Sequence, residues 1–140
     1  DKGFTPSSLI LDAPFVIDQG PGLPKWRPAN YTKKFYGPST MRLGIEKSRN
    51  LMTVRLAQTI GIESIVHYAN KFGIVDQLPM QLSMSLGAGE TTLIRLTTAY
   101  AMLVNGGKRI KPTLIDRIQD RHESYRNPHS QESNCQKRWM

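Results

Sequence analysis

Apolar residues recur with helical spacing at two places in residues 40–107, which are expected to be mainly helical. In each place, four residues fall at i, i+3, i+4 and i+7 and form one stripe along a helix. The two stripes are Ile62, Ile65, Val66 and Ala69, and Leu96, Ala99, Tyr100 and Leu103. Both patterns predict an amphipathic helix whose apolar face is packed against a core.

Residues at the edges of these patterns predict where the helices begin and end. Gly61 and Gly73 each follow a helical pattern, and glycine is the usual residue at a left-handed C-terminal stop. Either Thr91 or Thr92 can cap the start of the second predicted helix, which contains Leu96. The glycine pair at 106–107 is expected to end it.

The first part of the chain, Asp1 to Ser39, has a different pattern. It holds six of the nine prolines, which remove backbone donors and exclude a regular helix. We expect short strands around Leu9–Leu11 and Phe15–Ile17, followed by a long ordered loop. Four aromatic residues are predicted to pin this loop onto the body of the protein: Trp26, Tyr31, Phe35 and Tyr36.

The pattern changes again after Pro112. The stretch "TLIDRIQD" has Ile115 and Ile118 in positions that favour a partly buried strand. From there to Met140 the chain has no periodicity and few apolar residues, so residues 122–140 are expected to form a polar, disordered tail.

Composition narrows the classes of function. The 140 residues suffice for one domain, and the formal net charge of +8 predicts a basic, solvated surface. Tight pairs of basic residues occur only at 33–34, 108–109 and 137–138, so we expect no nucleic-acid site. There is no run of about 18 apolar residues that could span a membrane, and no signal peptide is recognised at Asp1.

The residues that could bind a metal are few. The chain has one cysteine and three histidines, and their spacing resembles no metal site. We therefore expect no metal and no cofactor, and an incidental or structural role for these four residues: His67, His122, His129 and Cys135.

The triplet Ser48-Arg49-Asn50 directly precedes a helical pattern and allows two interpretations. Asn50 could cap a helix that begins at Leu51. Alternatively, in an extended segment Ser48 and Asn50 would point to the same side and Arg49 to the other. A hydroxyl able to relay a proton would then lie beside an amide able to bind a carbonyl. The triplet alone does not decide between a cap and a catalytic motif.

The residues around the triplet carry a wider resemblance. They occur in order in the stretch "KWRPANYTKKFYGPSTMRLGIEKSRNLMTVRLAQTIGI": Trp26, Pro28, Asn30-Tyr31, Tyr36-Gly37, Met41-Arg42 and Ser48-x-Asn50. This series resembles the transpeptidase domain of bifunctional, class A penicillin-binding proteins of bacteria. The upstream "GFTPSSLILDAPF" and the downstream "LPMQLSMSLGAGETTLIRLTTAYAMLVNGGKRIKPTLIDRI" are similar to the same domain. The resemblance covers residues 1–121, which we interpret as part of such a domain, and the tail is unlike the family.

The resemblance implies an α+β fold of the serine D,D-transpeptidase and β-lactamase type, with an antiparallel sheet flanked by helices. This chain would supply mainly the helical part, with the Pro-rich loop region at its N-terminus. The implied activity is cross-linking of peptidoglycan stem peptides at the extracytoplasmic face of the cell membrane, and β-lactams would bind the same site. Ser48 would relay a proton as a catalytic residue, and Asn50 would bind the substrate.

Two motifs of the family's active site are missing from these 140 residues. The nucleophile motif S-x-x-K is absent, because no serine is followed three residues later by lysine. K-T-G is absent too, and Lys47-Ser48-Arg49 is the nearest sequence. We therefore expect a transpeptidase fragment that is inactive alone, with a complementary fragment as one partner that could complete the site. The alternative is a non-catalytic basic module that binds or scaffolds an anionic polymer or a partner protein.

Overall fold

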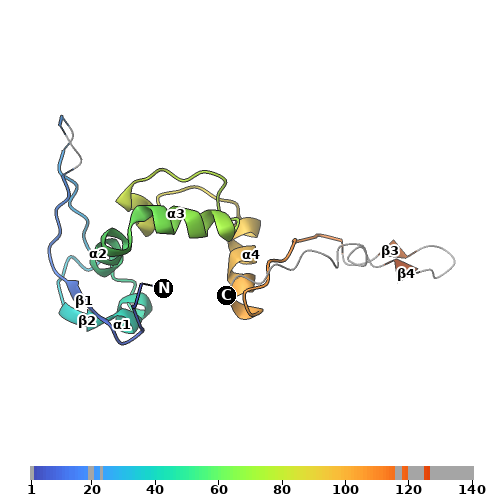
Figure 1. Cartoon of the computed structure of the whole chain (residues 1–140), viewed down its shortest axis with the longest axis horizontal. Coiled ribbons are helices and arrows are strands. Elements are labelled where there is room, and N and C mark those ends of the chain that lie inside the picture. Colours follow the sequence, from blue (N-terminus) through green and yellow to red (C-terminus); the bar gives the residue numbers. More distant parts are fainter. Residues whose placement is uncertain (1, 19–20, 23, 116–117, 120–124, 127–140) are drawn as a thin grey trace. The chain divides into compact units, whose positions relative to one another are not determined.

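The computed structural model describes residues 2–18, 21–22, 24–115, 118–119 and 125–126. The chain divides into two compact units, which are described separately. Unit 1 comprises residues 1–68 and 77–90, and unit 2 comprises residues 69–76 and 91–140. Helices and strands are mixed (Figure 1), which confirms the α+β class.

The elements follow one another in a fixed order. They are β1 (Leu9–Asp12), β2 (Gly37–Thr40), α1 (Met41–Glu46), α2 (Asn50–Ile60), α3 (Ile62–Lys71), the short 3₁₀ helix η1 (Leu82–Leu86), α4 (Leu93–Val104), β3 (Ile118–Gln119) and β4 (Tyr125–Arg126).

Unit 1 contains a two-stranded antiparallel sheet of β1 and β2 (Figure 1). In its register, Leu9 lies opposite Thr40. The strand expected around residues 9–11 is therefore confirmed as β1. Its side chains alternate, so that Ile10 and Asp12 are buried while the two leucines between and before them are exposed.

The second predicted strand, Phe15–Ile17, is wrong. Only an isolated bridge forms there, in which the backbones of Ile17 and Trp26 exchange two hydrogen bonds of 2.9 Å. Pro14 precedes Ile17 and Pro24 precedes Trp26 by a few residues. Proline lacks the backbone N–H that a longer ladder of hydrogen bonds needs.

The core of unit 1 forms where α1 and α2 meet the sheet. Thr40 caps α1 through its side chain, which accepts a hydrogen bond from the Leu43 amide. Gly44 is buried on the face of α1 toward α2, and a Cβ there would lie 2.8 Å from Cε of Met52. Helix α2 contributes the buried residues Leu51, Met52, Val54 and Ala57, and it packs against β1 and η1.

Helix α3 follows α2 after a single residue. Gly61 ends α2 as expected, and its φ of 88° is positive, but its ψ of 136° is extended, not left-handed helical. The extended ψ is consistent with a link in which α3 begins at the next residue. In the apolar stripe of α3, Val66 is buried and the other three residues are half-buried.

The end of α3 confirms the stop expected at Gly73. This glycine has a φ of 68°, and its amide donates to the Asn70 carbonyl at 2.9 Å. The Ile74 amide donates to the Ala69 carbonyl at 3.0 Å. The two bonds form a Schellman motif, which satisfies the last carbonyls of the helix.

Helix α4 in unit 2 has the predicted signals at both ends. Thr92 caps its start by accepting a hydrogen bond from the Arg95 amide. At its end, Gly106 and Gly107 both have positive φ, and the Gly107 amide donates to the Met102 carbonyl at 2.8 Å. An ion pair of 2.9 Å between Arg95 and Asp76 joins the helix to the segment after α3.

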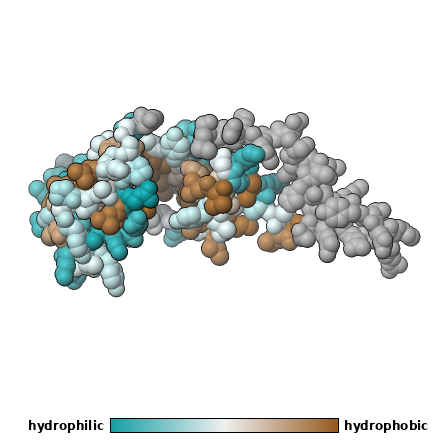
Figure 2. All heavy atoms as spheres, turned by 90° about the horizontal axis from the view of Figure 1, so that it is seen from below, coloured by the Kyte–Doolittle hydropathy of each residue, from teal (hydrophilic) through white to brown (hydrophobic). Residues whose placement is uncertain are grey.

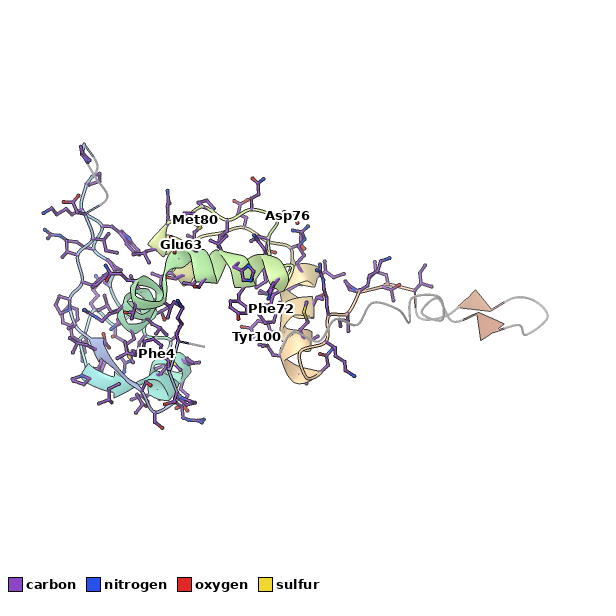
Figure 3. The ribbon with its side chains drawn as sticks, viewed as in Figure 1. Phe4, Glu63, Phe72, Asp76, Met80 and Tyr100 are labelled. Carbon is purple, nitrogen blue, oxygen red and sulfur yellow. The ribbon has the colours of Figure 1, made fainter. Side chains whose placement is uncertain are left out.

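The prediction that the stripe of α4 packs against a core is largely wrong. Ala99 is buried, but Tyr100 is 65% exposed and Leu103 is 66% exposed, and Leu96 is exposed too. Tyr100 projects from the helix (Figure 3), and Figure 2 shows hydrophobic side chains at the surface. Helical spacing determines which residues share a face, but it does not supply the residues that would cover that face.

The aromatic residues of the first loop do not pin it as predicted. Tyr31 is 98% exposed and Phe35 is also exposed, so the prediction is wrong for both. Trp26 is half-buried and belongs to the isolated bridge with Ile17. Tyr36 is instead covered on one face by an arginine of the triplet. Polar contacts, described below, hold this loop.

The C-terminal part agrees only in part with the expected strand. Ile115 is exposed, which contradicts a partly buried segment at that residue. Strand β3 does form further along and pairs antiparallel with β4. The predicted disorder of residues 122–140 falls outside the described residues except for the two residues of β4. In the part of the chain that the structure describes, no helix has the length and apolar character needed to cross a membrane.

Candidate active site

Ser48 occupies the turn between α1 and α2 in a conformation that serine rarely adopts. Its φ is 49°, in the left-handed region. Its amide donates to the Ile45 carbonyl at 3.1 Å, and the Arg49 amide donates to the Gly44 carbonyl at 2.9 Å. These bonds make Ser48 the left-handed residue of a Schellman motif at the end of α1, a position usually held by glycine. The left-handed conformation costs a non-glycine residue about 1 kcal/mol.

The Ser48 side chain is exposed at this turn. Its hydroxyl forms no hydrogen bond with any residue that the structure describes. The amides of Ser48 and Arg49 thus fix the backbone of the turn, while the Ser48 hydroxyl stays available to solvent or to a ligand.

Arg49 stacks on an aromatic ring of the preceding loop. Its guanidinium carbon lies 3.3 Å from the centroid of the Tyr36 ring, in a cation–π contact. The Tyr36 hydroxyl lies 3.2 Å from the Thr32 hydroxyl. The hydrogen bond with Thr32 is the largest cause that lowers the pKa of Tyr36, followed by a hydrogen bond with Arg49. Desolvation opposes these two effects, and the positive charges of Arg49 and Lys34 lower the pKa further.

Asn50 does not cap α2, so the cap interpretation of this residue is wrong. It is the first residue of the helix, and its side-chain amide donates to the Ala29 carbonyl at 3.0 Å. The extended-segment argument is also wrong, because Ser48 is left-handed and Asn50 is helical. The side chains of the triplet are therefore oriented by separate contacts and not by the alternation of a strand.

The cap of α2 comes from a residue twenty-one positions before Leu51. The Leu51 amide donates to Oδ1 of Asn30 at 3.3 Å. Nδ2 of Asn30 donates to Oδ1 and Oδ2 of Asp12 at 2.8 and 3.1 Å, and to the Lys34 carbonyl at 2.9 Å. Asn30 is 5% exposed and Asp12 is fully buried. One asparagine side chain thus connects β1, the loop and α2.

Arg55 of α2 binds the backbone carbonyls of residues that precede and follow Asp12 in the chain. Its Nε donates to the Leu11 carbonyl at 3.0 Å, and its Nη2 lies 3.3 Å from the carbonyls of Ala13 and Pro14. The guanidinium also lies 4.8 Å from the centroid of the Phe15 ring. A positive charge is therefore held against the backbone on both sides of Asp12.

The hollow found beside α1 and α2 is not a substrate site. It holds about 30 Å³, which is room for one water molecule, and its lining is mainly apolar: Ile10, Met41, Gly44, Ile45, Met52, Thr53 and Leu56. Among the described residues there is also no group of three or more His, Cys, Asp or Glu side chains that could hold a metal ion.

Comparison with known proteins gives the family. A model described as Penicillin binding protein transpeptidase domain matches residues 1–138. The chain belongs to this transpeptidase family. The penicillin-binding protein 1A of Rickettsia bellii is 52% identical over 122 residues, which are 87% of this chain and 15% of that protein. The penicillin-binding protein 1A of Pseudomonas aeruginosa is 39% identical, over 86% of this chain and 15% of that protein.

Solved structures agree with the fold of this chain. The crystal structure of penicillin-binding protein 1A from Haemophilus influenzae matches with a TM-score of 0.81 and 36% identity, over 89% of this chain and 18% of that one. PonA1 from Mycobacterium tuberculosis matches with a TM-score of 0.80 over 98% of this chain and 38% of that one, and at 17% identity it supports the fold alone.

These comparisons confirm the family resemblance drawn from the sequence, and they give no support to a non-catalytic basic module. The chain spans 15% of the length of the curated relatives cited here. The matched range runs to residue 138, and a division of the chain at residue 121 stays a prediction.

Sequence reasoning missed the buried pair Asp12 and Asn30, whose hydrogen bonds lead to the Leu51 amide directly after the triplet. Asn30 belongs to the series that carries the resemblance, but no role was expected for it. The position of Asp12 was a usable signal. It lies two residues after Ile10 in a short strand, so both side chains point to the same, buried face. A carboxylate at such a position requires a buried partner.

Proposed function

We propose that this chain forms one wall of the active site of a peptidoglycan D,D-transpeptidase. In the complete domain, a serine of an S-x-x-K motif attacks the carbonyl between two D-alanines of a stem peptide. The terminal D-alanine leaves, and an amine of a neighbouring strand then takes the acyl group. β-Lactams acylate the same serine. This chemistry takes place at the extracytoplasmic face of the cell membrane, where the polymer is assembled.

Ser48 and Asn50 carry the contribution of this chain. The Ser48 hydroxyl passes a proton toward the leaving nitrogen as part of general acid catalysis. The side-chain amide of Asn50 binds the backbone of the stem peptide. One of its N–H groups is used by the Ala29 carbonyl, which fixes the plane of the amide and leaves the second N–H and the oxygen for the substrate.

The observation that supports this proposal most directly is the conformation of Ser48. Glycine would occupy its left-handed position without strain, and the serine hydroxyl contributes no hydrogen bond among the described residues to offset the cost. A strained polar residue with an available hydroxyl is typical of a functional site. These contacts reveal no structural benefit of the strained backbone. We therefore infer that serine is kept at this position for the function of its hydroxyl.

The test needs a complete domain, in which residues of this chain replace the matching 122 residues of the Rickettsia bellii protein. Ser48→Ala and Ser48→Gly are expected to slow acylation by a fluorescent penicillin by about 100-fold or more, the scale of a lost proton-transfer group. The matched control is Ser7→Ala, since Ser7 is also an exposed serine of unit 1 outside the helices. If either Ser48 variant acylates at the parent rate, the proposed role of this residue is wrong.

The 140-residue chain alone is expected to form no covalent adduct, because no serine in it belongs to an S-x-x-K motif. Incubation with the fluorescent penicillin followed by a denaturing gel measures this directly. A stable labelled band at the 15.8 kDa of the chain would contradict the expectation.

A further inference from the structure

The geometry assigns Asp12 and Asn30 as positioning residues of the triplet. We propose that this buried pair fixes the start of α2 and the loop from Ala29 to Tyr36, and through them the side chains of Arg49 and Asn50. Only the catalytic consequence of this inference rests on the proposed transpeptidase function. The positioning itself concerns contacts that can be measured without any catalysis.

Asn30 uses both ends of its side chain in this role. Its amide nitrogen has two N–H groups, of which one serves the Asp12 carboxylate and the other the Lys34 carbonyl. Its oxygen accepts the Leu51 amide, the residue that directly follows the triplet. Strand, loop and helix are therefore held by one side chain with a fixed, planar geometry.

The loop held by Asn30 touches the triplet at two further points. The Ala29 carbonyl, adjacent to Asn30, accepts the hydrogen bond of Asn50 at 3.0 Å. Six residues after Asn30, the Tyr36 ring carries the guanidinium of Arg49 at 3.3 Å. A shift of the loop against α2 would change both contacts together, so the orientation of the triplet depends on Asn30.

The buried charge makes this arrangement demanding. Asp12 is fully buried, and an ionised carboxylate without partners is costly at such a site. Its side-chain partner is the Asn30 amide, and Arg55 binds the carbonyls that flank it. Apolar residues could fill the same space without requiring directional hydrogen bonds. A polar network instead restricts its members to one directional arrangement.

The first experiment uses the full 140-residue chain and the variant Asn30→Ala. Exchange of the Leu51 amide hydrogen is expected to become about tenfold faster, the effect of losing one hydrogen bond. The Leu96 amide of α4, bonded to the Thr92 carbonyl, should be unchanged. The hydrogen bond with Thr32, the largest cause of the lowered pKa of Tyr36, lies within the loop and should stay. The pKa of Tyr36, followed by NMR of its labelled ring, is therefore expected to rise part of the way toward its ordinary value of 10.0 as Arg49 leaves the ring.

The Tyr36 signal separates positioning from a merely structural role. If the pair only adds stability, the folded molecules keep Arg49 on the ring, and the pKa of Tyr36 stays at the parent value. That result would overturn the inference, as would an unchanged exchange rate at Leu51.

A second set of variants covers the case in which Asn30→Ala fails to fold. Asn30→Asp places two carboxylates face to face, whereas Asn30→Asp combined with Asp12→Asn restores a carboxylate–amide pair and an oxygen for the Leu51 amide. The double variant is expected to recover the slow Leu51 exchange, although the bond to the Lys34 carbonyl stays lost because a carboxylate has no N–H to donate. If Leu51 exchanges as fast in the double variant as in Asn30→Asp, the inference is wrong.

The catalytic arm uses the complete domain described above. Asn30→Ala is expected to slow acylation by about tenfold, with Ser7→Ala again as the control. If Ser48→Ala leaves acylation unchanged, the proposed function fails, while the exchange and pKa results on Asn30 still decide the positioning. If Ser48→Ala slows acylation but Asn30→Ala changes neither signal, only the positioning fails.

Discussion

Helices α2 and α4 have nearly the same length, with 11 and 12 residues, but their apolar side chains have different environments. In α2, Leu51 and Val54 are completely buried. In α4, Leu103 is 66% exposed and Val104 is 88% exposed. Both sequences are amphipathic. The difference lies in what each helix meets, since β1 and η1 pack against α2.

This comparison separates two kinds of information in a helical pattern. The spacing of apolar residues defines a face, and that part holds for both helices. Burial also requires a second surface, which unit 1 supplies for α2. Several large apolar side chains of α4 are exposed together, and grouped apolar surface of this kind indicates a surface that normally has a partner.

The largest effect is expected from Leu51→Ala, measured as the free energy of unfolding of the 140-residue chain. Removing a fully buried leucine leaves a cavity and should cost about 2–5 kcal/mol. Leu103→Ala on α4 is the matched control and should change stability by less than about 0.5 kcal/mol. Equal losses for the two variants would contradict the difference between the helices.

The comparison becomes sharper in the complete domain built with the Rickettsia bellii protein. There we expect the apolar face of α4 to be covered, so that Leu103→Ala costs about 2 kcal/mol. Thermal or denaturant unfolding of the domain with and without the substitution measures this. A cost that stays as small as in the isolated chain would show that the face is exposed in the complete domain too.

A smaller effect is expected where the two regions end a helix in the same way. Ser48 ends α1 and Gly106 ends α4, each with positive φ. Ser48→Gly should raise the free energy of unfolding by about 1 kcal/mol because it relieves strain. Gly106→Ser should lower it by about the same amount, although a Cβ there meets nothing within 4 Å. Changes of the same sign in both variants would refute this explanation.

The smallest effect is expected from removal of residues 122–140. If this stretch is a polar tail, its loss should change the free energy of unfolding by less than about 0.5 kcal/mol. Hydrogen exchange of the intact chain provides a second measurement, in which these amides should exchange within seconds. Strong protection there would mean that the stretch belongs to the folded domain.

The features that the sequence predicted correctly are those determined by neighbouring residues. Thr92 caps α4 through an amide three residues away, and Gly73 ends α3 through carbonyls within one turn. The strand at residues 9–11 follows from a short run of three apolar residues. In each case the physical cause lies within a few positions of the residue concerned.

The features that were missed depend on residues far apart in the chain. The cap of α2 comes from Asn30 and not from Asn50, because a loop brings the distant side chain to the Leu51 amide. The exposure of Tyr31 and Leu103 depends on which surfaces are present to cover them. The conformation of Ser48 depends on how α1 ends, and a serine gives no signal for a position that favours glycine.

The hydrogen bond between Asn30 and Leu51 also has a consequence for the order of folding. It joins residues 21 positions apart, so the start of α2 is complete only after the intervening loop has closed. Closing such a loop costs conformational entropy, which local contacts do not repay. A synthetic peptide of residues 46–61 would contain the whole triplet but lack its cap, and a helix of this length is marginal alone in water. The triplet should therefore become ordered in the same cooperative step as the loop and β1, not as an early local element.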